Sequence, residues 1–256
     1  MAQLKESELK KQIKEKAFVP LYFLYGEEKY LISHYTEAIV NKVLGKSYSD
    51  FNFQAFDGGK ASIDEIADAA QALPLFAERK CVLVKDLNVE ALNAGELAKL
   101  YQLLEELSAT TVIMISQSTP EVDAKRSAKW KTFIAAAEKN GTAVLLEKRG
   151  EIALEKQLVQ WAEKRGCGLT QINAGKIIQL CGDDLLTLSS ELEKLCAYAV
   201  GREITKDDID LLVTKNLETT VFVLGNALMA VNYDKAYQQL DLLFYQKEEP
   251  VAVLAV

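Results

Sequence analysis

Short apolar segments alternate with amphipathic segments over the first 146 residues, and this pattern constrains the fold more than any other feature. The apolar segments have the length of buried strands, and the segments between them carry apolar residues at helical spacing. Parallel sheets have this organisation because a helix follows each strand and covers a face of the sheet. The sequence therefore predicts an α/β domain with strands at 18–25, 51–56, 81–84, 110–116 and 143–146 and helices at 30–44, 62–73, 94–107 and 128–139.

The strand pattern stops after Leu146, and only helical patterns follow. Helices are predicted at 152–165, 174–180, 185–200 and 206–212, and a further helical segment at 218–246. The chain finishes on VAVLAV, an apolar stretch with no visible partner, so we expect either a truncated chain or a last domain that something else completes. At the other end, residues 1–16 predict an amphipathic surface helix without the apolar core of a secretory signal.

A glycine turn after the first strand of a parallel sheet is where a phosphate-binding P-loop would lie. That loop requires G-x-x-x-x-G-K-[ST], in which backbone amides, a lysine and a hydroxyl hold phosphate and magnesium. Here the segment from Gly26 to Ser33 reads GEEKYLIS, which has no second glycine and a displaced Lys29. Glu27 and Glu28 would offset the helix dipole and repel a phosphate. We therefore expect no nucleotide at this turn and no cofactor elsewhere.

Other catalytic and metal-binding patterns are weak. The single histidine, His34, lies within a predicted helix, where we expect a partly buried structural role. Asp86 follows a strand beside Lys85 without a second acid, so we expect a solvated side chain. The four cysteines form no C-x-x-C pair and lie in or beside apolar segments, which indicates reduced structural residues in a cytoplasmic protein and no metal site.

The formal net charge of −7 argues against a protein that wraps nucleic acid, because such affinity depends largely on lysine and arginine. A local basic cluster surrounds Trp130, however, and is a candidate DNA contact. Its usual explanation is a solvated helix start. The cluster comprises Lys125, Arg126, Lys129 and Lys131.

The segment 71–80, QALPLFAERK, joins a predicted helix to a predicted strand and places Leu75 and Phe76 in a turn. Pro74 ends the helix, because proline disfavours helical backbone in the residue before it. The pattern alone favours packing of both side chains back onto the core. If they are exposed, they form a binding hot spot, because full burial of a Leu or Phe side chain contributes roughly 1.5–3 kcal/mol.

Several segments, taken in order, resemble the delta subunit of the bacterial DNA polymerase III clamp loader. They are PLYFLYGEEKYL at 20–31, QALPLFAERKCVLVKDL at 71–87, TVIMIS at 111–116, GDDLLTLSSELEKLCAYA at 182–199, ITKDDIDLLV at 204–213 and ALMAVNYDKAYQQLDLLFYQKEEPVAVL at 227–254. The resemblance implies an AAA+-type parallel-sheet domain without a P-loop at 1–147, a small all-helical lid at 148–214 and the incomplete start of a helical collar at 215–256.

The resemblance also implies a function without intrinsic catalysis. Delta subunits bind the sliding clamp through a hydrophobic plug that matches Leu73, Pro74, Leu75 and Phe76, and this binding favours a clamp ring that can open. The implied partners are the sliding clamp, the ATPase and other subunits of the loader, and DNA through the complex, with no membrane.

Two other functions remain open from the sequence. One is a degenerate P-loop enzyme that still depends on a nucleotide. The other is a DNA-binding accessory protein that acts through the cluster at 125–131.

Overall fold

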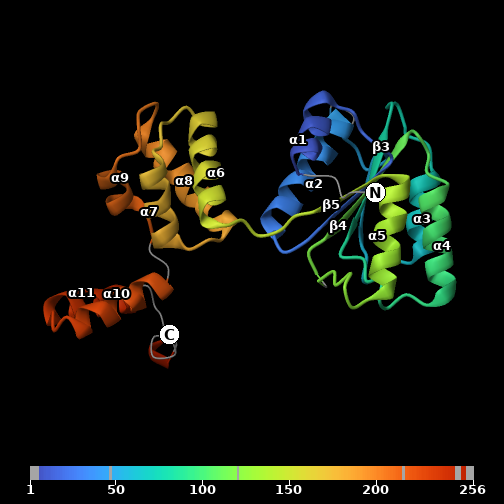
Figure 1. Ribbon diagram of the computed structural model, residues 1–256. Helices are drawn as coiled ribbons and strands as arrows, with labels where there is room; N and C mark the ends of the chain where they lie inside the picture. The colour runs from blue at the N-terminus through green and yellow to red at the C-terminus, as the bar shows by residue number, and fades with distance from the viewer. Residues whose placement is uncertain (1–5, 46–47, 120, 215–216, 246–248, 252–256) are drawn as a thin grey trace. The chain divides into compact units, whose positions relative to one another are not determined.

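The computed structural model describes residues 6–45, 48–119, 121–214, 217–245 and 249–251 (Figure 1). The chain divides into two compact units, residues 1–148 and 149–256. The closing residues 252–256, most of the apolar VAVLAV stretch, lie outside the described part of the chain. Among the described residues, no helix is long and apolar enough to cross a membrane.

The first unit is built on a five-stranded parallel sheet in the order β2-β3-β4-β1-β5. The strands are β1 (Leu21–Tyr25), β2 (Phe53–Asp57), β3 (Lys80–Lys85), β4 (Thr111–Gln117) and β5 (Thr142–Leu145). Strands β1, β3 and β4 are buried almost throughout, as expected for central strands of a parallel sheet. The predicted α/β class is confirmed.

Helices cover both faces of this sheet (Figure 1). One face carries α1 (Glu6–Glu15) and α2 (Lys29–Leu44), and the other carries α3 (Ile63–Gln71), α4 (Ala94–Glu105) and α5 (Ala128–Asn140). Because side chains alternate along a strand, each central strand contributes to both cores. On the α3–α5 side, Phe23 stacks on Tyr25 and packs edge-on against Phe133.

Several boundaries in this unit differ from the prediction. Strand β1 begins at Leu21 and not at residue 18, and α4 ends at Glu105 and not at residue 107. Strand β2 begins at Phe53, and Phe51, predicted within the strand, is 68% exposed. The reason is a turn, in which the Ser49 carbonyl accepts hydrogen bonds from the backbone amides of Asn52 and Phe53. Helix α3 ends at Gln71 because Ala72 is already extended, so Leu73 lies in the following loop.

The second unit is helical. It contains α6 (Glu151–Lys164), α7 (Gln171–Cys181), α8 (Leu185–Ala199), α9 (Lys206–Leu212), α10 (Leu217–Met229) and α11 (Tyr233–Tyr245). The fully buried leucines Leu158, Leu188 and Leu192 belong to the core shared by α6 and α8. Helices α10 and α11 pack against each other.

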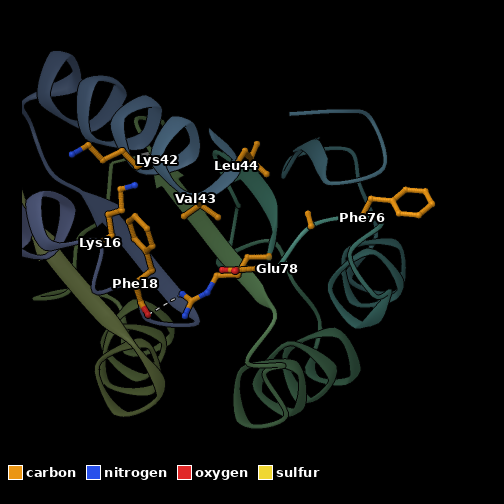
Figure 2. Close-up of a pocket in the computed structure, with 9 residues that line it drawn as sticks. Lys16, Phe18, Lys42, Val43, Leu44, Phe76 and Glu78 are labelled. Carbon is orange, nitrogen blue, oxygen red and sulfur yellow. Dashed lines mark hydrogen bonds between the residues drawn. The ribbon is translucent and has the colours of Figure 1, made fainter. Parts of the chain in front are cut away.

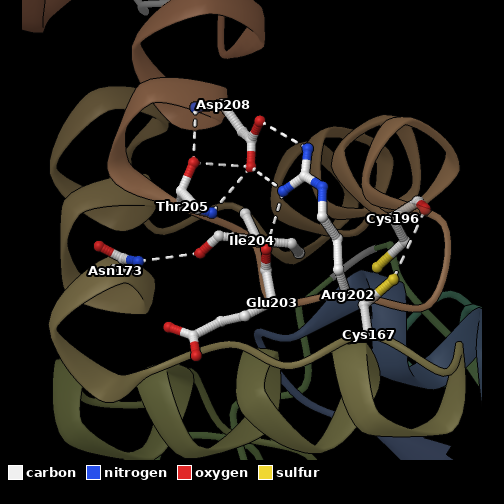
Figure 3. A network of polar contacts seen from close by, with 8 residues as sticks. All are labelled: Cys167, Asn173, Cys196, Arg202, Glu203, Ile204, Thr205 and Asp208. Atoms are coloured by element: carbon white, nitrogen blue, oxygen red, sulfur yellow. Dashed lines mark hydrogen bonds and ion pairs between the residues drawn. The ribbon is translucent and has the colours of Figure 1, made fainter.

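A polar network fixes the loop that enters α9 (Figure 3). The Arg202 guanidinium donates to both carboxylate oxygens of Asp208, at 2.6 and 2.9 Å. The same carboxylate accepts from the Thr205 backbone amide, and the Thr205 hydroxyl accepts from the Asp208 amide, which completes a capping box. In addition, the Asn173 side chain of α7 donates to the Ile204 carbonyl at 2.9 Å. The network therefore joins α7, the loop and α9.

Candidate clamp-binding site

The turn after β1 lies where a P-loop would be and is closed by the backbone that follows β5. The Glu28 amide donates to the Leu146 carbonyl at 3.0 Å, and the Leu146 amide donates to the Tyr25 carbonyl at 2.7 Å. Gly26 has a φ of +133°, and a Cβ built there would stand 2.2 Å from the Leu146 oxygen. Glycine is therefore required at this position by close backbone packing, independently of any phosphate.

Carboxylates surround the same turn. Glu28 is the N-cap of α2 and is 7% exposed, and Glu27 beside it is exposed. A cavity of about 370 Å³ adjoins the turn, and its acidic lining residues are Glu27, Glu121, Asp123 and Glu147. Burial, together with the nearby Glu138 and Glu147 carboxylates, raises the pKa of Tyr25 to about 12. Lys125 is the cation of this lining, so four carboxylates against one lysine leave an excess of negative charge that disfavours a phosphate.

Two predictions about single residues of the first unit were wrong. His34 is exposed and stacks on Tyr30 with ring centroids 6.0 Å apart, because its position on α2 faces away from the sheet. Asp86 is half-buried, with a φ of +56°. Its Oδ1 accepts hydrogen bonds from the amides of Ser118 and Thr119, each at 2.7 Å, so Asp86 joins the loops after β3 and β4.

The loop between α3 and β3 presents apolar side chains to solvent. Phe76 is 98% exposed, Leu73 78% and Leu75 43%, while Pro74 is half-buried. The pattern-based expectation that Leu75 and Phe76 pack onto the core is wrong. The Phe76 ring extends away from the sheet (Figure 2). Its backbone has a φ of +53°, which is costly for a bulky side chain, so surrounding contacts must hold the loop in this shape.

Asn52, which is only 2% exposed, makes the contacts that hold the loop. Its Oδ1 accepts from the Leu75 amide and its Nδ2 donates to the Leu75 carbonyl, both at 2.8 Å. Its own carbonyl accepts from the Cys81 amide at 2.8 Å, which fixes Asn52 to the start of β3. A buried side chain with both polar atoms on one residue's backbone sets the position and orientation of that residue. The sequence pattern missed Asn52, since it lies 23 positions away and side-chain-to-backbone contacts leave no periodic signal.

The exposed loop and the acidic turn lie at opposite ends of the strands of the sheet. The loop precedes β3, and Asn52 directly precedes β2, so both lie at the amino ends of the strands. The turn at Gly26 follows β1 and lies at the carboxyl ends, where ligands of open α/β sheets usually bind. The candidate contact site is therefore separate from the usual nucleotide position.

The four cations of the candidate DNA contact have different environments. Lys129 donates to the carbonyls of Glu90 and Leu92, at 2.7 and 2.8 Å, and Arg126 forms an ion pair with Asp123 at 3.6 Å. Lys125 and Lys131 are exposed. Trp130 is 2% exposed and stacks on Phe23 in the core, so it presents no aromatic surface to a base.

The cysteines are reduced and buried, and burial raises the pKa of the Cys81 thiol to about 12. In the described part of the chain, no cluster of three or more histidine, cysteine, aspartate or glutamate side chains has the geometry to hold a metal ion.

The sheet order and the flanking helices place the chain in the class of AAA+-like α/β proteins. Residues 22–144 match the model of the family described as DNA polymerase III, delta subunit. DNA polymerase III subunit delta of Bacillus subtilis (strain 168) is 26% identical over 258 residues, which cover 96% of this chain and 72% of the relative. The probable DNA polymerase III subunit delta of Aquifex aeolicus (strain VF5) is 22% identical, covering 95% of this chain and 68% of the relative.

A solved structure supports the same relationship. The Bacillus subtilis DNA clamp loader delta protein superposes with a TM-score of 0.75 at 25% identity, covering 97% of this chain and 74% of that one. The resemblance to the delta subunit of the DNA polymerase III clamp loader is confirmed, and it extends over almost the whole of this chain.

Proposed function

We propose that this chain is a subunit of the DNA polymerase III clamp loader that hydrolyses no ATP and binds the sliding clamp through Leu73, Pro74, Leu75 and Phe76. The observation that carries the proposal is the 98% exposure of Phe76 on a loop whose backbone is held by a buried asparagine. An exposed aromatic on a fixed backbone loses little conformational entropy on binding, which is the property of an interface anchor.

The proposed mechanism is differential binding. The loop binds the clamp conformation in which the ring can open more tightly than the closed one, and so shifts the population toward opening. ATP-hydrolysing subunits of the loader supply the energy for the cycle. The acidic surroundings of the Gly26 turn support a subunit that takes no part in that hydrolysis.

The domain organisation belongs to the same proposal. Residues 1–147 form the clamp-binding domain, 148–214 the lid, and 215–256 the start of the collar that contacts the other loader subunits. The complex operates in the cytoplasm and brings the chain to DNA, where Lys125, Arg126, Lys129 and Lys131 remain candidate contacts.

The test is the affinity of the purified chain for the sliding clamp of the same organism. Leu75→Ala combined with Phe76→Ala is expected to weaken binding by about two orders of magnitude or more, since each side chain loses roughly 1.5–3 kcal/mol of burial. The thermal stability should change little, because the Phe76 side chain is exposed.

The matched control is Ile172→Ala with Leu186→Ala, which removes two exposed apolar side chains, 86% and 60% exposed, from the second unit. It should leave clamp affinity unchanged. Equal affinity of the loop variant and the wild type would reject the proposed site.

A further inference from the structure

A cavity of about 490 Å³ lies beside the exposed loop, and cations from three separate segments line it (Figure 2). Lys16 comes from the residue after α1, Lys42 from the last turn of α2, and Arg79 from the residue before β3. Phe76 is also a lining residue, so the cavity and the exposed loop form one continuous surface. A partner large enough to cover both the Phe76 ring and the backbone around it would also lie over this cavity.

Two of the three cations donate to backbone carbonyls, and none of the three forms an ion pair with a described carboxylate. Lys42 Nζ donates to the Ile13 carbonyl at 3.1 Å, and Arg79 Nη1 donates to the Phe18 carbonyl at 3.2 Å. Among the described residues, no carboxylate oxygen lies within 4 Å of Lys16, Lys42 or Arg79. Glu78 is the acid of the lining, so the cavity carries a net charge of +2, from three cations and one anion.

The helix dipole explains the position of only one of the three cations. Lys42 lies in the last turn of α2, where a cation is favourable to the helix dipole. That explanation does not extend to Arg79, which precedes a strand. The cavity also contrasts with the one at the opposite ends of the strands, whose charged lining residues are four acids and one lysine. The first unit thus has an acidic edge and a cationic edge, within a chain of net charge −7.

We propose that this cationic cavity binds acidic side chains of the same protein partner that receives Phe76. The inference rests on the proposed function. It adds, beside the apolar contact through Phe76, an electrostatic contact between the cavity and the partner. Protein carboxylates fit better than nucleic-acid phosphates because the three cations line one concavity with Phe18 in its wall, whereas contact along a nucleic-acid backbone needs basic residues spread over a longer patch or stripe.

Charges at the rim of an interface act mainly on the association rate and its dependence on salt. We therefore expect Lys16→Glu with Lys42→Glu to slow association with the sliding clamp about tenfold at low ionic strength. The difference should shrink toward zero as salt rises from about 50 mM to about 500 mM, because salt screens exposed charges. The dissociation rate constant should change less than the association rate constant.

The matched control is Lys29→Glu with Lys85→Glu, which makes the same change in net charge at exposed positions of the same unit, at the opposite ends of the strands. Its association rate should stay within about twofold of the wild type. A second variant gives an effect of opposite sign. Glu78→Gln removes the one acid of the lining and should accelerate association, which a purely structural role would not produce.

The outcomes separate the two proposals. If Leu75→Ala with Phe76→Ala abolishes clamp binding but the Lys16 and Lys42 reversal behaves like its control, the cavity proposal is wrong and the loop proposal stands. If the reversal weakens binding to primed DNA and leaves clamp association intact, the ligand is nucleic acid and the cavity proposal is again wrong. A wild-type chain that does not bind the clamp overturns both.

Discussion

Asn52 is the residue on which the geometry of the exposed loop depends most. Its side chain makes two hydrogen bonds to the Leu75 backbone, and its main chain is bonded to β3. Leu75 is 43% exposed, so water can replace part of what Asn52 supplies if the amide is removed. Loss of Asn52 should therefore loosen the loop more than it destabilises the fold.

The corresponding prediction concerns Asn52→Ala. We expect a loss of about 1–2 kcal/mol in the free energy of unfolding, from two broken hydrogen bonds. Amide hydrogen exchange at Leu75 should become faster, and clamp affinity should fall although Leu75 and Phe76 are intact. Asn140→Ala is the control, because its amide bonds the Ala136 carbonyl within α5. Unchanged exchange at Leu75 in Asn52→Ala would contradict the positioning role.

At the same scale, the sequence identified the right segment but not the exposure of its side chains. Pro74, Leu75 and Phe76 were recognisable as an apolar turn, yet the pattern favoured burial because apolar side chains usually pack inward. What reverses this is Asn52, together with the left-handed backbone of Phe76. Neither follows from local spacing, so exposure could be anticipated only through the family resemblance.

At the scale of elements, prediction succeeded where the signals are local. Helix α9 has the predicted bounds, and its start, like that of α3, is set by a local capping box, Thr205–Asp208 in α9 and Ser62–Glu65 in α3. The buried strands were recognisable as apolar runs because both faces of a parallel sheet are covered. Errors occurred where a tertiary contact decides, as in the turn at Ser49 that displaces Phe51 from β2.

The Arg202–Asp208 pair at the start of α9 leads to a prediction about how folding stability depends on pH (Figure 3). Hydrogen bonds from Arg202, and then from the Thr205 amide, lower the pKa of the Asp208 carboxyl well below its ordinary value. Since the folded pKa lies below the unfolded value of about 3.9, the pair stabilises the fold above that pH and the stabilisation is lost as pH falls through the folded pKa.

We expect the stability of the wild type to decrease on acidification below about pH 4, and Asp208→Asn to lose that part of the pH dependence and to be less stable at neutral pH. Denaturant titrations of both variants across pH 2–7 provide the measurement, with Asp183→Asn, at an exposed position, as the control. Identical pH profiles for Asp208→Asn and the wild type would show that protonation of Asp208 does not affect the stability of the fold.

At the scale of the whole molecule, the two edges of the sheet have different surfaces. The carboxyl edge combines a closed glycine turn with an acidic cavity, and the amino edge combines an exposed apolar loop with a cationic cavity. The sequence predicted the acidic turn from Glu27 and Glu28, but not the cavity that Glu121, Asp123 and Glu147 complete. It could not predict the cationic cavity, because Lys16, Lys42 and Arg79 come together only through the fold.

This division predicts that the chain takes no nucleotide at the Gly26 turn. Calorimetric titration with magnesium-ATP at millimolar concentration should give no binding heat, since the acids around the turn repel phosphate. A saturable heat that is lost when the turn is altered would instead support the degenerate P-loop enzyme. The test needs no partner protein, so it is independent of clamp binding.

The most direct test of the central claim is a contact measurement at Phe76 itself. A photo-crosslinking phenylalanine analogue placed at position 76, in the whole chain mixed with the sliding clamp, should yield a covalent adduct with the clamp on irradiation. The same analogue at Ile172, which is 86% exposed on the second unit, should yield none. A crosslink from position 172 alone, or from neither position despite measurable binding, would contradict the account.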